Sequence, residues 1–194
     1  MRLQTSLVIA LVGFSLTIAA ARPAAQQVDK RPVTFTAFAV SLGDVATPSG
    51  AGTIEMRIDR WSTDEQRKRL VTAFQEGGSD ALMDALEDLP RAGYIRSPGS
   101  LGYHLHFAYQ SPLAEGGRQI ILLTDRYMSF WEAANRPRSV DYPFTLVELR
   151  LDKHDEGVGK VSIAAKVTAA RGNLLTLEDF ATQPVRLTQV KRRG

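Results

Sequence analysis

The chain has no cysteine among its 194 residues, which excludes disulfide bonds and a thiol nucleophile. It also lacks the GxSxG elbow of serine hydrolases, the Walker phosphate-binding loop and the HExxH zinc motif. Only three histidines are present. These absences remove the common catalytic signatures, so the sequence favours a non-catalytic binding protein over an enzyme and predicts no cofactor.

A strong excess of one charge is missing as well. The 24 basic and 21 acidic residues leave a net charge of +3. The two short basic runs, Arg67-Lys68-Arg69 and Lys191-Arg192-Arg193, lie far apart in the sequence, whereas nucleic-acid binding needs basic residues gathered on one surface. We therefore interpret the first run as a solvated helix face and predict no nucleic-acid partner.

The first 21 residues have the pattern of a secretory signal peptide. Arg2 precedes the apolar stretch 7–18, and Ala19-Ala20-Ala21 supplies small residues for cleavage, with cuts after Ala20 or Ala25 as alternatives. An uncleaved N-terminal anchor is the other interpretation. Residues 22–32 are polar and bounded by prolines, which is typical of a flexible leader, and 33–191 are predicted to form one globular domain. An exported, disulfide-free domain that is periplasmic or secreted, with no membrane span after cleavage, is expected.

Alternation of apolar and polar residues predicts most of this domain to be β-structure. In the stretch 53–60, Ile54, Met56 and Ile58 alternate with charged residues, so that one side of the strand is buried and the other is wet. Glycine and proline separate the stretches and predict hairpin turns. The predicted strands are 33–42, 53–60, 101–110, 118–125, 144–152, 160–168, 174–180 and 185–190. Within 101–110, the residues Leu101, Tyr103, Leu105, Phe107 and Tyr109 are expected to share one face.

One helical insertion is predicted between the second and third strands. Ser62 and Glu65 have capping-box spacing, and Gly77-Gly78 should end a first helix before a second one runs to about Leu89. The fold class expected is therefore mostly β (α+β). It is an antiparallel meander of about eight strands, closed into a small barrel or open as a curved sheet or sandwich, with a helical hairpin inserted at about 62–89.

The segment 124–144, TDRYMSFWEAANRPRSVDYPF, is too long for an ordinary connection and gathers aromatic and charged residues. We predict that it is ordered, caps one end of the sheet and carries any ligand site on its rim. Its carboxylates, Asp125 among them, could serve acid–base chemistry or could simply pair with the neighbouring arginines. The residues predicted for a ligand site are Arg126, Tyr127, Trp131, Glu132, Asn135, Arg138, Asp141 and Tyr142.

His104 and His106 form a second candidate site. Residues two apart on a strand point the same way, so both rings could contact one metal ion. No third ligand is marked by spacing, and two polar residues on the wet side of a strand account for the pattern equally well. We expect both histidines to lie at the surface without binding a metal tightly.

The strings GYIRSPGSLGY at 93–103 and FWEAANRPRSVDYPFTLVELRLD at 130–152 resemble a family of uncharacterised exported bacterial proteins. This resemblance implies export and no particular activity. Two functions are expected: binding of a small ligand or an envelope protein, or, alternatively, a cell-envelope hydrolase that uses carboxylates of 124–144 or a metal at His104 and His106. An exported scaffold without any pocket is a third possibility.

Overall fold

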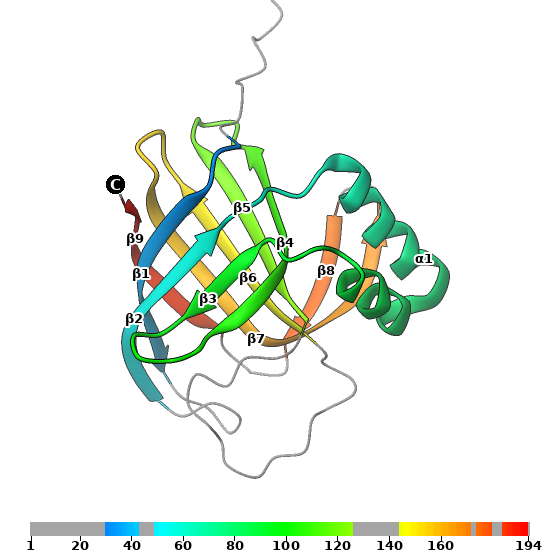
Figure 1. The fold of residues 1–194 in the computed structure, drawn as a ribbon, viewed down its shortest axis with the longest axis horizontal. Coiled ribbons are helices and arrows are strands. Elements are labelled where there is room, and N and C mark those ends of the chain that lie inside the picture. The colour runs from blue at the N-terminus through cyan, green and yellow to red at the C-terminus, as the bar shows by residue number, and fades with distance from the viewer. Residues whose placement is uncertain (1–29, 43–48, 126–143, 172–173, 180–183, 194) are drawn as a thin grey trace, which may run out of the picture.

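The structure is a computed structural model that describes residues 30–42, 49–125, 144–171, 174–179 and 184–193, with the backbone alone at 163–171 and 174–179. The described residues form nine strands and one helix (Figure 1). In chain order they are β1 (Val33–Leu42), β2 (Ser49–Ile58), α1 (Asp64–Glu87), β3 (Gly93–Arg96), β4 (Tyr103–Pro112), β5 (Arg118–Thr124), β6 (Phe144–Leu151), β7 (Glu156–Arg171), β8 (Leu174–Asp179) and β9 (Val185–Arg193).

Eight of these strands close into an antiparallel barrel. Strands β1 to β7 are neighbours in chain order, and β9 lies between β7 and β1. The predicted mostly-β meander with a helical insertion is thus confirmed, and the barrel is the form it takes. Closure satisfies the edges that an open sheet of this length would leave unpaired. No helix in the described part of the chain is long and apolar enough to cross a membrane.

Strand β3 was not predicted, because it has only four residues in a turn-rich stretch. Residues 93–96 pair with β2 on one side and β4 on the other, and so complete the barrel wall. Gly93 packs directly on the β2 backbone: a Cβ there would lie 1.9 Å from the Arg57 carbonyl oxygen. A glycine that looked like a turn signal is therefore a site where two backbones approach closely.

The single predicted face of β4 is wrong. A register irregularity between Leu105 and Phe107 shifts the alternation, so Leu105 and Ala108 pack inside the barrel while Phe107 and Tyr109 pack under α1. A bulge adds one residue to one strand of a pair and reverses the facing of the residues that follow it. A prediction that assumes regular alternation along a strand cannot reveal such a reversal.

Helix α1 begins one residue later than predicted. Thr63 is the N-cap: its side chain accepts a hydrogen bond from the Gln66 N–H, and the Gln66 side chain accepts one from the Thr63 N–H. The predicted cap, Ser62, is buried and exchanges hydrogen bonds with the backbone of Ala108 instead. The predicted break is present at Gly78, whose φ of 69° and ψ of −151° are not helical, and α1 bends there.

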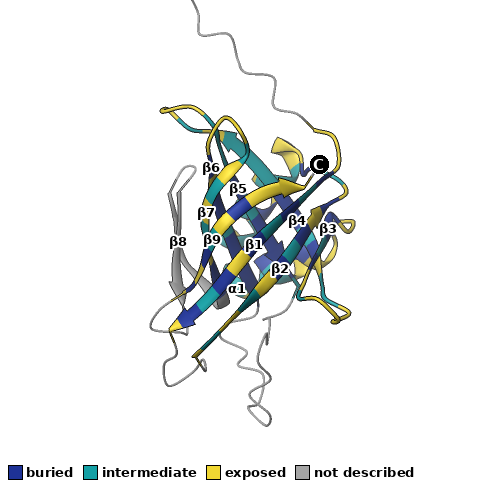
Figure 2. Cartoon of the chain, turned by 90° about the vertical axis from the view of Figure 1, so that its left-hand side faces the viewer, coloured by how far each residue is buried: buried dark blue, intermediate teal, exposed yellow. Residues whose placement is uncertain are grey.

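Two apolar cores result, one inside the barrel and one between α1 and the outside of β4, β5 and β6. Strand β5 belongs to both: Ile120 and Leu122 face the interior, and Leu123 faces the helix. This explains the unbroken apolar run of β5, because a strand that is covered on both sides has no solvent-exposed face and so needs no alternating polar residues. The opposite side of the barrel, made by β9, β1 and β2, is not covered by any helix of the described residues (Figures 1 and 2).

Candidate functional site

All eight residues predicted for the ligand site lie outside those that the structure describes. These are Arg126, Tyr127, Trp131, Glu132, Asn135, Arg138, Asp141 and Tyr142. The prediction that this segment is ordered and caps the sheet lies there too. Asp125, which directly follows β5, is among the described residues and lies near His106.

The two candidate histidines lie in different environments. His104 is exposed, as predicted, but the side chain of His106 is only 16% exposed. Its Nδ1 lies 3.1 Å from the Leu89 carbonyl oxygen, and its Nε2 lies 3.7 Å from a carboxylate oxygen of Asp125. The irregularity in β4 thus joins His106 to the end of the helical region. Among the described residues, no group of three or more histidines and carboxylates is placed to hold a metal ion.

The barrel interior is filled by its own large side chains. Each of nine such side chains is at most 1% exposed, whereas a gap large enough for water would leave its lining residues measurably exposed. A small apolar ligand therefore finds no ready space beside these residues. They are Phe35, Met56, Ile58, Ile95, Leu105, Ile120, Leu122, Leu149 and Leu151.

A charged cluster closes one end of this interior. The Arg118 guanidinium donates two hydrogen bonds to Asp155, of 2.9 and 2.8 Å, and a third to Gln110. It lies 5.7 Å from the Phe35 ring and 5.8 Å from the Trp61 ring. Since the side chains of Arg118 and Asp155 are only 12% and 16% exposed, this bidentate pair shields the aromatic rings below it. We interpret it as a structural plug.

The exposed surface opposite α1 carries an apolar row that the sequence analysis did not single out. We call it the β1 patch, and it consists of Phe38, Val40 and Leu42 with their cross-strand neighbours Ala51, Thr53, Arg186 and Thr188. Phe38 is 42% exposed and Leu42 is 61% exposed. Figure 2 looks onto this side of the barrel, across β9, β1 and β2.

The alternation of inward and outward residues along β1 already indicates this patch. In the β1 sequence VTFTAFAVSL, Phe35 belongs to the buried set, whereas Phe38 shares its parity with the outward Thr34 and Thr36. The outward set therefore changes from hydroxyl to apolar residues halfway along the strand. Large apolar residues on the outward side of a regular strand indicate a surface that something else covers.

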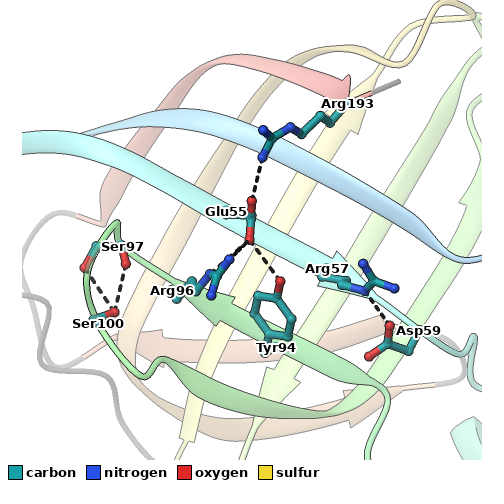
Figure 3. Close-up of polar contacts among 8 residues, drawn as sticks. All are labelled: Glu55, Arg57, Asp59, Tyr94, Arg96, Ser97, Ser100 and Arg193. Carbon is teal, nitrogen blue, oxygen red and sulfur yellow. Dashed lines mark hydrogen bonds and ion pairs between the residues drawn. The ribbon is translucent and has the colours of Figure 1, made fainter.

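An ion-pair network lies beside the β1 patch, on the outside of β2, β3 and β9 (Figure 3). We call it the Glu55 network. Tyr94 donates a hydrogen bond of 2.9 Å to Glu55 Oε1, Arg96 donates two to the same oxygen, and Arg193 donates one of 3.0 Å to Oε2. Arg193 crosses β1 to reach Glu55, over the short side chains of Thr34 and Thr36. The network thus joins β2, β3 and β9, and its bond from Arg193 to Glu55 spans β1.

The Glu55 network holds its carboxylate ionised. The hydrogen bond from Tyr94 lowers the pKa of Glu55 below its ordinary value, and the Arg96 and Arg193 guanidinium groups lower it further against the effect of burial. Burial, together with the hydrogen bond to Glu55, raises the pKa of Tyr94. A carboxylate of this kind serves as a permanent anion and is poorly suited to donate a proton near neutral pH.

Glu55→Gln is expected to lower the free energy of unfolding by about 1 kcal/mol at neutral pH, since charged hydrogen bonds become neutral ones on a partly exposed surface. Because folding depresses the pKa of Glu55, its contribution is present above the unfolded-state pKa and is lost as pH falls through the folded-state pKa. The difference between wild type and variant should therefore shrink in acid. Urea unfolding curves at neutral and acidic pH measure it.

Asp59→Asn provides the matched control. Asp59 accepts a 2.7 Å bond from Arg57 on the same side of the barrel, but both side chains are more than 40% exposed. This change should alter the free energy of unfolding by less than about 0.5 kcal/mol. Equal losses in the two variants, or a Glu55→Gln deficit that persists unchanged in acid, would show that the Glu55 network does not act as described.

Comparison with known proteins gives no match: no family model, no curated protein and no solved structure is similar to this chain at a significant level. The resemblance of 93–103 and 130–152 to uncharacterised exported proteins therefore stays a prediction. What the chain does has to be inferred from its own surface.

Proposed function

We propose that this protein is an exported, non-catalytic domain that binds a protein partner through the β1 patch. The observation that carries the proposal is the exposure of Phe38 and Leu42, which lie with Val40 along the outward face of β1, opposite the side of the barrel that α1 covers. Burying such side chains against a partner is favourable by about 1.5–3 kcal/mol each.

The surroundings of the β1 patch suit a protein partner better than a small ligand. The patch lies on the outside of a sheet, whereas a small molecule is usually bound in a concave pocket that buries most of its surface. A large aromatic anchor beside an arginine is the composition of many binding hot spots. Arg186 lies opposite Val40 and is exposed, so the partner should place an acidic group there.

A hydrolase that uses carboxylates is less well supported by the described residues. Glu55, Glu148 and Asp152 all have lowered pKa values. For Glu148, burial raises the pKa, but hydrogen bonds from Lys160 and Gln119 outweigh it. A general acid needs the opposite shift, toward neutral pH. Export itself rests on the pattern of 1–21, and N-terminal sequencing of protein recovered outside the cytoplasm tests it.

Phe38→Ser is expected to weaken binding of the partner by about 30-fold or more, which corresponds to the loss of about 2 kcal/mol typical of an aromatic anchor. A photo-crosslinking amino acid at position 38, introduced in the producing cells, captures the partner. Titration of the purified partner with wild type and Phe38→Ser then measures the affinity.

Val158→Ser is the control, since Val158 is 56% exposed on β7 and is not part of the β1 patch. It should leave the affinity unchanged, and a photo-crosslinker at position 158 should not trap the same partner. Equal trapping at both positions, or an unchanged affinity for Phe38→Ser, would contradict the proposal. Binding of the purified protein to lipid vesicles, with no partner protein present, would identify the β1 patch as a membrane contact instead.

A further inference from the structure

Strand β7 has 16 residues and continues to Arg171, beyond its last pairing with a barrel strand at Ala165. Its first part pairs with β9 as far as Val161 and with β6 as far as Ala165. Beyond Ala165 its only described partner is β8, which runs back antiparallel from Leu174 to Asp179. The two form a ribbon that leaves the barrel wall and lies on the same side as α1 (Figure 1). Neither outer edge of this ribbon pairs with another described strand.

The two edges of the ribbon differ in sequence. The β7 edge carries Lys166 and Arg171, and a register irregularity lies between Val167 and Ala169. Charged residues, especially lysine, and bulges are the usual means by which an exposed strand is kept from pairing. Strand β8 reads LLTLED, without lysine, proline or glycine, and its charges are confined to the last two residues. The β8 edge is therefore the one left open to a further strand.

A two-stranded ribbon is only marginally stable by itself. Helix α1 contacts β7, whereas β8 pairs with no described strand other than β7, so its outer edge can accept a further strand. We propose that β8 pairs antiparallel with β8 of a second copy of this chain, which makes the protein a dimer with a continuous four-stranded ribbon at its centre. This inference is independent of the β1 patch, which lies on β1, β2 and β9.

Self-complementarity of β8 argues for a second copy. In antiparallel pairing about a twofold axis, the central residue of one copy lies opposite the same residue of the other copy. Every other residue i lies opposite a residue j, and residue j of the first copy lies opposite residue i of the second. Centred on Thr176, the register sets Leu175 of each copy opposite Leu177 of the other, and Leu174 opposite Glu178. Apolar residues thus meet at the centre, and no two like charges oppose each other.

The absence of cysteine allows a direct test, since Thr176→Cys carries the only thiol in the chain. In the proposed register the two thiols lie opposite each other, so mild oxidation should convert most of the protein to a covalent dimer. Val158→Cys places a thiol at an exposed position of β7 and serves as the control for random collision. It should remain mainly monomeric under denaturing, non-reducing electrophoresis.

Thr176→Lys gives a second measurement, because it sets two ammonium groups opposite each other at the twofold axis. Sedimentation equilibrium should show a dimer for wild type and for Val158→Lys, and a dissociation constant about fivefold higher for Thr176→Lys. Circular dichroism checks that each variant is folded. A wild-type monomer at every concentration, or equal crosslinking of the two cysteine variants, would overturn the proposal, even if another protein were found to add a strand at β8.

Discussion

Replacing Phe35 with alanine is expected to lower the free energy of unfolding by about 3–5 kcal/mol. The ring is completely buried inside the barrel and lies under the Arg118 guanidinium, at a distance of 5.7 Å. Its removal takes away apolar contacts and leaves a cavity that the surrounding strands, held by their hydrogen bonds, cannot close. Urea unfolding followed by tryptophan fluorescence measures the loss. Since total stabilities are about 5–15 kcal/mol, this change should bring the domain close to unfolding.

Phe38→Ala is the matched control, on the same strand and with the same atoms removed. Phe38 is 42% exposed, so its truncation should cost less than about 1 kcal/mol. Similar losses at the two positions would mean that the assignment of inward and outward residues in β1 is wrong. The same comparison separates stability from function, because we expect Phe38 and not Phe35 to contact the partner.

Replacing Leu86 with alanine is expected to cost about 2–5 kcal/mol. Leu86 is completely buried in the second core, where α1 packs on the outside of the barrel against residues such as Phe144 and Leu146. The helix and the barrel wall meet in this core, and truncation of Leu86 removes contacts that hold α1 against the strands. Thermal unfolding should shift to lower temperature, and hydrogen exchange in α1 should rise before that of β1.

Leu101→Ala is the control, because it removes the same atoms from a leucine that is not buried. Leu101 is fully exposed between β3 and β4, so its truncation should change the free energy of unfolding by less than about 0.5 kcal/mol. If Leu86→Ala were equally mild, α1 would be only loosely attached. The unbroken apolar run of β5 would then not be due to α1, because a cover on both sides of the strand would be missing.

Local patterns of the sequence were enough for most strands. The predicted stretch 33–42 coincides with β1, and those at 118–125 and 144–152 end within one residue of β5 and β6. Alternation within a strand is a local consequence of which side faces the core, so it can be recognised from neighbouring residues alone. The break at Gly78 was visible for a similar reason, since consecutive glycines destabilise a helix wherever they occur.

The candidate site was less predictable. The sequence drew attention to the aromatic segment 124–144, most of which lies outside the described residues. The positions of Phe38 and Leu42 in the alternation of β1 place both on its outward face. Whether that face is exposed depends on which side of the barrel α1 covers, and the sequence does not show this. Glu55, Tyr94, Arg96 and Arg193 come from three strands separated by up to 138 residues, and no spacing joins them.

By itself, therefore, the sequence determined that this is a cysteine-free, mostly antiparallel β domain with one interrupted helical insertion. Only the tertiary structure decided that the sheet closes into a barrel. Alternating strands serve a barrel and a sandwich equally, and the difference rests on pairing β1 with β9, between residues about 150 apart in the chain. Closure also selects which outward residues remain uncovered. The proposed binding surface follows from that selection, because an apolar side chain becomes a candidate contact only when no other part of its own chain buries it.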